Sequence, residues 1–351
     1  MATFDVKPSN YVFVVDSPEN NATSPITSAG HGPTGPLRTT RWKADCHPRA
    51  REVCERVDRF YYNSWPFKSV DAKKKFLKTG IPRFACLSHP RATDDRIYFA
   101  CSLYTLLFLI DDLLEDMSLV EGKAFNRSLV SLMRGDRQPD RTIPVEYITY
   151  DLWKEMRACD NRLTAEVLEA TVGFMEAQTE QVRIEMQDFG QYLRYRDRDV
   201  GQAVMAAVGR YTIGIRLTPD EFRRVSRIDT NSARHLGVVN DICSWDKEVS
   251  KAEQSTEEGA VLCSAVKTLA DVSALSPAAA KRLLWTMVGE WELQHEELHQ
   301  QLIRSPEGYR DELGKYVSAL EDLMSGHLHW SITTPRYGFS ESSSSSSFAG
   351  M

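Results

Sequence analysis

Residues 97–116 read IYFACSLYTLLFLIDDLLED, and this stretch decides the fold class. An apolar run from Ile97 to Ile110 is followed at once by four carboxylates within six residues. The apolar run is too short to cross a bilayer, which takes about 20 residues. It therefore predicts a helix buried inside protein, spanning about 93–116, with Thr93 as its N-cap.

The overall composition is that of a soluble globular protein. The 351 residues are 42% hydrophobic and 26% charged, with a net charge of −6, so a nucleic-acid binder is not indicated. Seven cysteines lie at irregular spacings without a Cys-x-x-Cys pair, which indicates neither a zinc site nor a disulfide framework. With no signal-peptide pattern, we expect a cytoplasmic protein with reduced thiols and no membrane segment.

The two ends of the chain differ from its middle. Residues 1–40 are rich in Ser, Thr, Asn, Pro and Gly, residues 340–351 read SESSSSSSFAGM, and both are expected to be disordered. Apolar residues recur at helical spacing between them, which predicts a single all-α domain at 41–339. Its further expected helices are 164–187, 232–251, 277–303 and 309–329, with Pro219, Pro277 and Pro306 at helix starts or ends.

The acidic run is an unusual helix ending. Asp111 and Glu115 share one face, and Asp112 and Asp116 form a second pair about 100° away. The helix dipole disfavours carboxylates at this end by roughly 0.3–1 kcal/mol each. Bound cations reverse that preference, and carboxylate oxygens suit Mg²⁺. Taken alone, the run is equally typical of a helix that emerges into solvent.

A second oxygen-rich stripe follows in the segment 240–248, NDICSWDKE. Asn240, Ser244 and Glu248 recur at every fourth position and offer an amide, a hydroxyl and a carboxylate to one hard cation. Lys247 lies only about 20° from Asn240 around a helix, so its ammonium could meet an anion bound to the same metal. The preceding residues 235–239 are mostly apolar, which indicates a stripe facing inward.

These motifs carry a family resemblance. The Asp-Asp-x-x-Glu run at 111–115, the Asn-Asp-x-x-Ser-x-x-x-Glu segment at 240–248, and then Arg336 and Tyr337 stand in the order found in class I terpene synthases. The chain most resembles the fungal sesquiterpene cyclases of the aristolochene synthase type, over about 41–337. The resemblance implies a helical bundle around a deep apolar pocket. It also implies a small-molecule partner, farnesyl diphosphate. The protein itself would be a monomer or a homodimer.

The resemblance further implies a metal site with three Mg²⁺ ions. Asp111 would bridge two of them, and Asn240, Ser244 and Glu248 would hold the third. Carboxylates adjacent to Asp111 then remain without an assigned role: they are Asp112, Glu115 and Asp116.

The diphosphate and the carbocation would be met by other residues. Diphosphate contacts are implied for Arg196, Lys247, Arg336 and Tyr337, the last two from a closing C-terminal loop, and a backbone kink is implied at Val200-Gly201. Facing the cation would be three aromatic residues: Phe108, Phe174 and Trp330. Such a pocket must be apolar, because the allylic cation must be kept from water. The region around Arg83-Phe84 does not match the family clearly, and the terpene product stays open.

Two other enzyme classes and one non-enzymatic role compete with this interpretation. His295-Glu296-Glu297-Leu298-His299 matches His-Glu-x-x-His, the helix motif of zinc peptidases, although no third histidine follows at the expected spacing. Chain-elongating prenyltransferases also bind Mg²⁺, but usually through two Asp-rich motifs, whereas the second motif here is Asn/Ser/Glu. A non-catalytic helical binding protein would have no need of that second motif.

Overall fold

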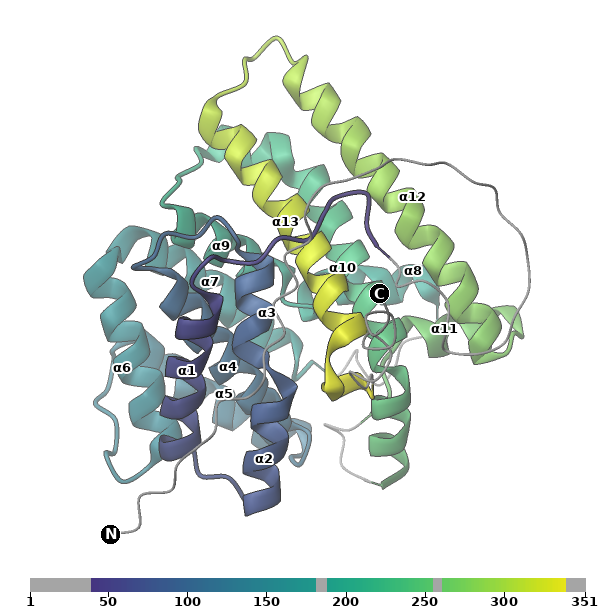
Figure 1. Cartoon of the computed structure of the whole chain (residues 1–351). Helices are drawn as coiled ribbons and strands as arrows, with labels where there is room; N and C mark the ends of the chain where they lie inside the picture. Colours follow the sequence, from purple (N-terminus) through teal and green to yellow (C-terminus); the bar gives the residue numbers. More distant parts are fainter. Residues whose placement is uncertain (1–38, 181–187, 255–260, 339–351) are drawn as a thin grey trace, which may run out of the picture.

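The computed structural model describes residues 39–180, 188–254 and 261–338, and within these ranges every regular element is a helix (Figure 1). The all-α prediction is therefore confirmed. The helices are α1 Ala50–Ser64, α2 Val70–Thr79, α3 Ile81–Ser88, α4 Ile97–Leu114, α5 Leu119–Arg134, α6 Pro144–Cys159, α7 Asn161–Ala177, α8 Phe189–Asp199, α9 Gln202–Ile213, α10 Pro219–Gln254, α11 Ala265–Ser273, α12 Pro277–Ile303, α13 Asp311–Thr333 and the short 3₁₀ helix η3 Pro335–Tyr337.

Helix α4 forms the centre of the bundle. It contacts α1, α3, α6 and α9, and eleven of its fourteen residues from Ile97 to Ile110 are buried. By length and composition alone α4 could cross a membrane, but 67% of that window is buried inside the protein. On the other side, α10 packs against both α12 and α13 (Figure 1). The apolar stretch thus serves as a core helix, as predicted.

Several helix boundaries were predicted well. α12 spans the predicted 277–303, and Pro219 and Pro277 are the first residues of α10 and α12. Proline is favoured there because the first amide of a helix has no acceptor. Pro306 lies in the connection between α12 and α13, as expected. All seven cysteines are free thiols.

Other boundaries were wrong. α4 begins at Ile97 rather than near Thr93, and no side chain caps its first turn. The amide and hydroxyl of Thr93 instead both donate to the Thr212 carbonyl, at 2.9 and 3.2 Å. α7 begins at Asn161, where the Asp160 side chain accepts from the Leu163 amide, and it ends at Ala177. Residues 181–187 of the expected helix lie outside the described residues.

The remaining expected helices are longer than predicted or shifted. α10 covers Pro219–Gln254 rather than 232–251, and α13 covers Asp311–Thr333 rather than 309–329. The first half of α10 carries many polar residues, so the apolar helical spacing on which the sequence prediction depended is weak there. The predicted disordered ends, 1–40 and 340–351, lie almost wholly outside the described residues, and those predictions stay predictions.

Candidate active site

One pocket gathers the residues that the sequence motifs indicated. It opens between α4, α7, α8, α9, α10 and α13 with η3, and its wall is polar at one end and apolar at the other. All eleven site residues predicted from the sequence line it: Phe108, Asp111, Phe174, Arg196, Asn240, Ser244, Lys247, Glu248, Trp330, Arg336 and Tyr337. The tertiary structure therefore brings together positions that are far apart along the chain.

The carboxylates at the end of α4 form a compact cluster. Oxygen atoms of Asp111, Asp112 and Glu115 lie within 4.8 Å of one another, and among the described residues these three side chains are the group close enough together to share a metal ion. Burial, and next the Glu115 carboxylate, raise the pKa of Asp111 to about 6. Gln178, which no motif indicated, donates to Asp111 Oδ1 at 3.0 Å. A cation at this cluster would stabilise the charged carboxylates.

Basic side chains occupy the outer faces of this cluster. The Arg336 guanidinium lies 2.8 Å from Asp112, and the Lys247 ammonium lies 3.1 Å from Glu115. Lys251 bonds to the exposed Asp116 at 2.9 Å, and Asp116 is not part of the metal group. The structure thus gives a contact to each carboxylate that had no assigned role. Asp112 pairs with Arg336 and Glu115 pairs with Lys247, the two basic residues predicted to contact the diphosphate. Asp116 forms surface ion pairs.

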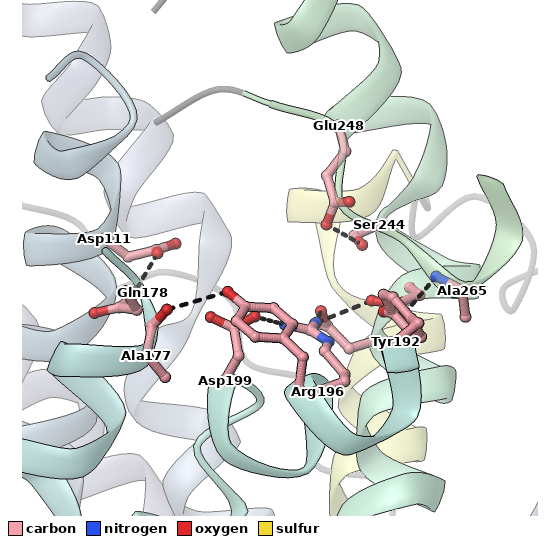
Figure 2. Close-up of polar contacts among 12 residues, drawn as sticks. Asp111, Ala177, Gln178, Tyr192, Arg196, Asp199, Ser244, Glu248 and Ala265 are labelled. Carbon is pink, nitrogen blue, oxygen red and sulfur yellow. Dashed lines mark hydrogen bonds and ion pairs between the residues drawn. The ribbon is translucent and has the colours of Figure 1, made fainter. Parts of the chain in front are cut away.

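The stripe on α10 faces the same pocket from the opposite wall. Ser244 donates to Glu248 Oε1 at 2.5 Å (Figure 2). Asn240 donates to the Tyr337 hydroxyl at 2.9 Å. Burial, and next the charge of Asp241, raise the pKa of Glu248 above its usual range. Amide, hydroxyl and carboxylate oxygens together fit a hard divalent cation, which would favour the ionised form of Glu248.

Arg196 lies between the two walls, held by three acceptors. Its guanidinium donates to Asp199 at 2.5 Å, to the Asn240 amide oxygen at 2.7 Å and to Asp241 at 2.9 Å (Figure 2). The fully buried Asp241 carboxylate also accepts hydrogen bonds from Tyr192 and from the Ala265 amide. Asp199 and Asp241 were not predicted as site residues, although Asp199 lies three positions after Arg196 and Asp241 directly follows Asn240. They fix Arg196 toward the pocket.

The predicted kink at Val200-Gly201 is present between α8 and α9. Gly201 adopts a φ of +77°, a left-handed conformation that costs other residues roughly 1–2 kcal/mol. A Cβ at this position would also lie 3.4 Å from the Phe174 ring. The glycine thus lets the chain turn from one helix into the next directly against a pocket aromatic.

Aromatic rings cover much of the apolar end. Trp330 lies 5.8 Å from Phe108 and 5.6 Å from Tyr337, between ring centroids. Phe84, on α3, lies 5.0 Å from Trp330 and 6.0 Å from Phe108, and it also lines the pocket. No motif marks Phe84 as a site residue, although the Arg83-Phe84 region was set apart in the sequence as one that does not match the family clearly.

The His-Glu-x-x-His segment on α12 has no metal-binding geometry. His299 bonds through Nδ1 to Glu321 at 3.0 Å and through Nε2 to Tyr309 at 2.8 Å. His295 is buried with its ring centroid 5.3 Å from that of Trp42, and burial lowers its pKa to about 3. The two imidazoles serve packing and hydrogen bonding, which argues against the zinc peptidase alternative.

Comparison with known proteins agrees with this geometry. Residues 102–293 match the family model "Terpene synthase family 2, C-terminal metal binding". The chain is 47% identical to aristolochene synthase of Penicillium roqueforti over 298 residues, covering 85% of this chain and 87% of that protein. It is 48% identical to aristolochene synthase of Aspergillus terreus over 293 residues, covering 83% and 91%.

A solved structure agrees as well. The crystal structure of the Penicillium roqueforti aristolochene synthase superposes with a TM-score of 0.76 at 45% identity, over 85% of this chain and all of that one. The expected bundle around a pocket is thus the fold of this relative too. The chain belongs to terpene synthase family 2, the class I terpene synthases, and is a relative of the fungal aristolochene synthases.

Proposed function

We propose that this sesquiterpene cyclase uses three Mg²⁺ ions, held by Asp111 on one wall and by Asn240, Ser244 and Glu248 on the other, to release diphosphate from farnesyl diphosphate. The observation that carries the proposal is the pairing of two oxygen-rich helix segments across one pocket, joined by the 3.1 Å contact between Lys247 and Glu115. All of the proposed ligand atoms are oxygens, which are the ligands that Mg²⁺ prefers. Bound Mg²⁺ would supply Lewis acidity toward the phosphate oxygens of the leaving group.

The basic residues would bind the diphosphate. Lys247 and Arg336 are each held by one carboxylate at the pocket mouth, so both can exchange that partner for a phosphate oxygen. Arg196 and the Tyr337 hydroxyl both contact Asn240, so a diphosphate gripped by them would sit beside the proposed metal ligands. Positive groups placed before ionisation stabilise the charge that develops on the leaving group.

The apolar end would control the carbocation. Phe108, Phe174 and Trp330 line this part of the pocket, and an aromatic face stabilises a cation by roughly 0.5–2 kcal/mol without capturing it. Arg336 stands 5.1 Å over the Phe108 ring, so the diphosphate site and the aromatic wall are adjacent. Closure of the segment bearing Arg336 and Tyr337 would exclude water.

The product would be a cyclic sesquiterpene. Several relatives at 45–48% identity are named for aristolochene, so aristolochene is the first reference compound. We also propose that the chain acts in the cytoplasm as a monomer or homodimer.

The purified full chain with farnesyl diphosphate and Mg²⁺ provides the test. We expect stoichiometric diphosphate release and a sesquiterpene detectable by gas chromatography, both abolished by chelation. Asp111→Ala, and separately Asn240→Leu with Ser244→Ala, should each lower turnover by roughly 10²-fold or more, since the leaving-group charge loses its stabilisation.

A matched control is His299→Gln, which alters the peptidase-like motif and lies outside the pocket wall. It should keep turnover. Full activity in both metal-site variants would refute the metal assignment. A longer diphosphate made when isopentenyl diphosphate is added would instead support the chain-elongating alternative.

A further inference from the structure

A buried histidine–tyrosine pair lies at the apolar end of the pocket. Tyr104 stands two helical turns before Asp111 on α4, about 10.5 Å along the axis, and on the same face. Its side chain lines the pocket, and its hydroxyl lies 2.5 Å from Nε2 of His89. Tyr104 is 3% exposed and His89 is 4% exposed, so the pair is closed off from bulk water.

The surroundings of this pair are otherwise apolar. Among the described lining residues, Tyr104 and His327 are the groups at this apolar end that can accept a proton. The other such groups lie at the opposite end, where the metal ions are proposed to bind. The rest of this end is built from aromatic, aliphatic or thioether side chains that offer no base: Phe84, Leu107, Phe108, Phe174, Val204, Met205 and Trp330. A polar pair inside such a wall costs free energy unless its members bond to each other, as they do here.

Tyr104 is better placed than His327 for passing on a proton. The Tyr104 hydroxyl bonds directly to a second base, His89, which lies behind it and is not part of the pocket wall. His327 packs against Phe84, with ring centroids 5.7 Å apart, and its buried Nδ1 has no hydrogen-bond partner. A proton taken up by His327 would have no onward acceptor from that atom, whereas one taken up by Tyr104 has one.

We propose, on the basis of the function proposed above, that Tyr104 is the catalytic base that ends the cyclisation and that His89 takes the proton onward. A C–H bond beside the cationic carbon breaks, and its electron pair forms the C=C bond of the product. The proton goes to the Tyr104 oxygen while the hydroxyl proton of Tyr104 passes to Nε2 of His89. His89 becomes imidazolium, Tyr104 is regenerated, and the proton leaves to solvent when the site opens.

The protonation state of the pair suits this role. Burial lowers the pKa of His89 to about 3, so the imidazole is neutral at ordinary pH and available to accept. Burial also raises the pKa of Tyr104 well above its usual range, so the phenol keeps its proton until the relay operates. A carbocation is a far stronger acid than either group, so a weak base within reach is sufficient.

The decisive variant is Tyr104→Phe, which removes one oxygen and keeps the ring. Loss of a positioned base slows its step by on the order of 10²-fold, so products of deprotonation elsewhere should gain at least about tenfold relative to the wild-type product. Diphosphate release should continue, because ionisation precedes the step. The matched control is Tyr61→Phe, whose buried hydroxyl bonds to the Ser102 carbonyl at 2.8 Å and lies off the pocket, and it should keep the wild-type products.

Variants of His89 distinguish a role in passing the proton onward from a role in packing alone. His89→Phe should shift the products as Tyr104→Phe does, whereas His89→Gln, which retains an acceptor, should restore part of the wild-type pattern. An unchanged product pattern in Tyr104→Phe, or a shift confined to His327→Leu, would overturn the proposal. Absence of diphosphate release from the unsubstituted chain would instead refute the proposed function. A Tyr104→Phe chain that fails to fold leaves the decision to the His89→Phe and His89→Gln pair.

Discussion

Gly237 on α10 makes room for the stem of Arg196. A Cβ on Gly237 would lie 2.9 Å from Cγ of Arg196, and a shift of that atom would carry the guanidinium away from Asn240 and Asp241. Charged hydrogen bonds of this kind are worth about 1.5–3 kcal/mol each. We therefore expect Gly237→Ala to lower kcat/KM for farnesyl diphosphate by about 10- to 100-fold.

The fold should tolerate the same substitution, because alanine in a helix is favoured over glycine by about 1 kcal/mol. The control is Gly289→Ala on α12, where nothing lies within 4 Å of the added Cβ. It should leave kcat/KM unchanged and stabilise the protein slightly. Equal kinetics in both variants would show that Arg196 needs no such clearance.

At the scale of the element, α10 carries the stripe of Asn240, Ser244 and Glu248, and a carboxylate near the start of the helix anchors it. Glu221 is buried and accepts from Arg310 at 2.6 and 2.8 Å and from the Thr218 amide at 2.8 Å. Hydrogen bonding to Arg310 is the largest cause that lowers the pKa of Glu221, to about 2. The lowered pKa means that the folded state holds the ionised form more tightly than the unfolded state does.

This contribution to the free energy of unfolding is complete above the unfolded-state pKa and is lost as pH falls toward 2. We expect Glu221→Gln to lower the free energy of unfolding at pH 7 by about 1–2 kcal/mol, after allowance for the half-exposed Arg310. Urea denaturation at pH 7 and pH 3 provides the measurement. The deficit should fall to less than half at pH 3, and an equal deficit at both pH values would contradict the assignment.

At the scale of the whole molecule, the site exists only in the folded state. Its walls come from α4, α8, α10 and η3, which meet through contacts such as Lys247 with Glu115 and Arg336 with Asp112. A ligand that binds only this assembled site stabilises the fold, by about 2.7 kcal/mol at a hundred times its Kd. Mg²⁺ with inorganic diphosphate should therefore raise Tm more than the sum of the two added alone.

The double variant Asn240→Leu with Ser244→Ala should lose this synergy, because one proposed ion loses two ligands. Differential scanning fluorimetry of both proteins measures it. A synergy that survives in the variant would place the Mg²⁺–diphosphate complex elsewhere on the protein.

Local patterns in the sequence determined the helical fold, the boundaries of α12 and the positions of the two oxygen-rich motifs. These are features set by periodicity, proline placement and ligand spacing within single helices. The sequence could not show that Asp112 holds Arg336, that Asp241 holds Arg196, or that Phe84 completes the aromatic wall. Each of those contacts joins helices distant along the chain, and only packing decides which side chains meet.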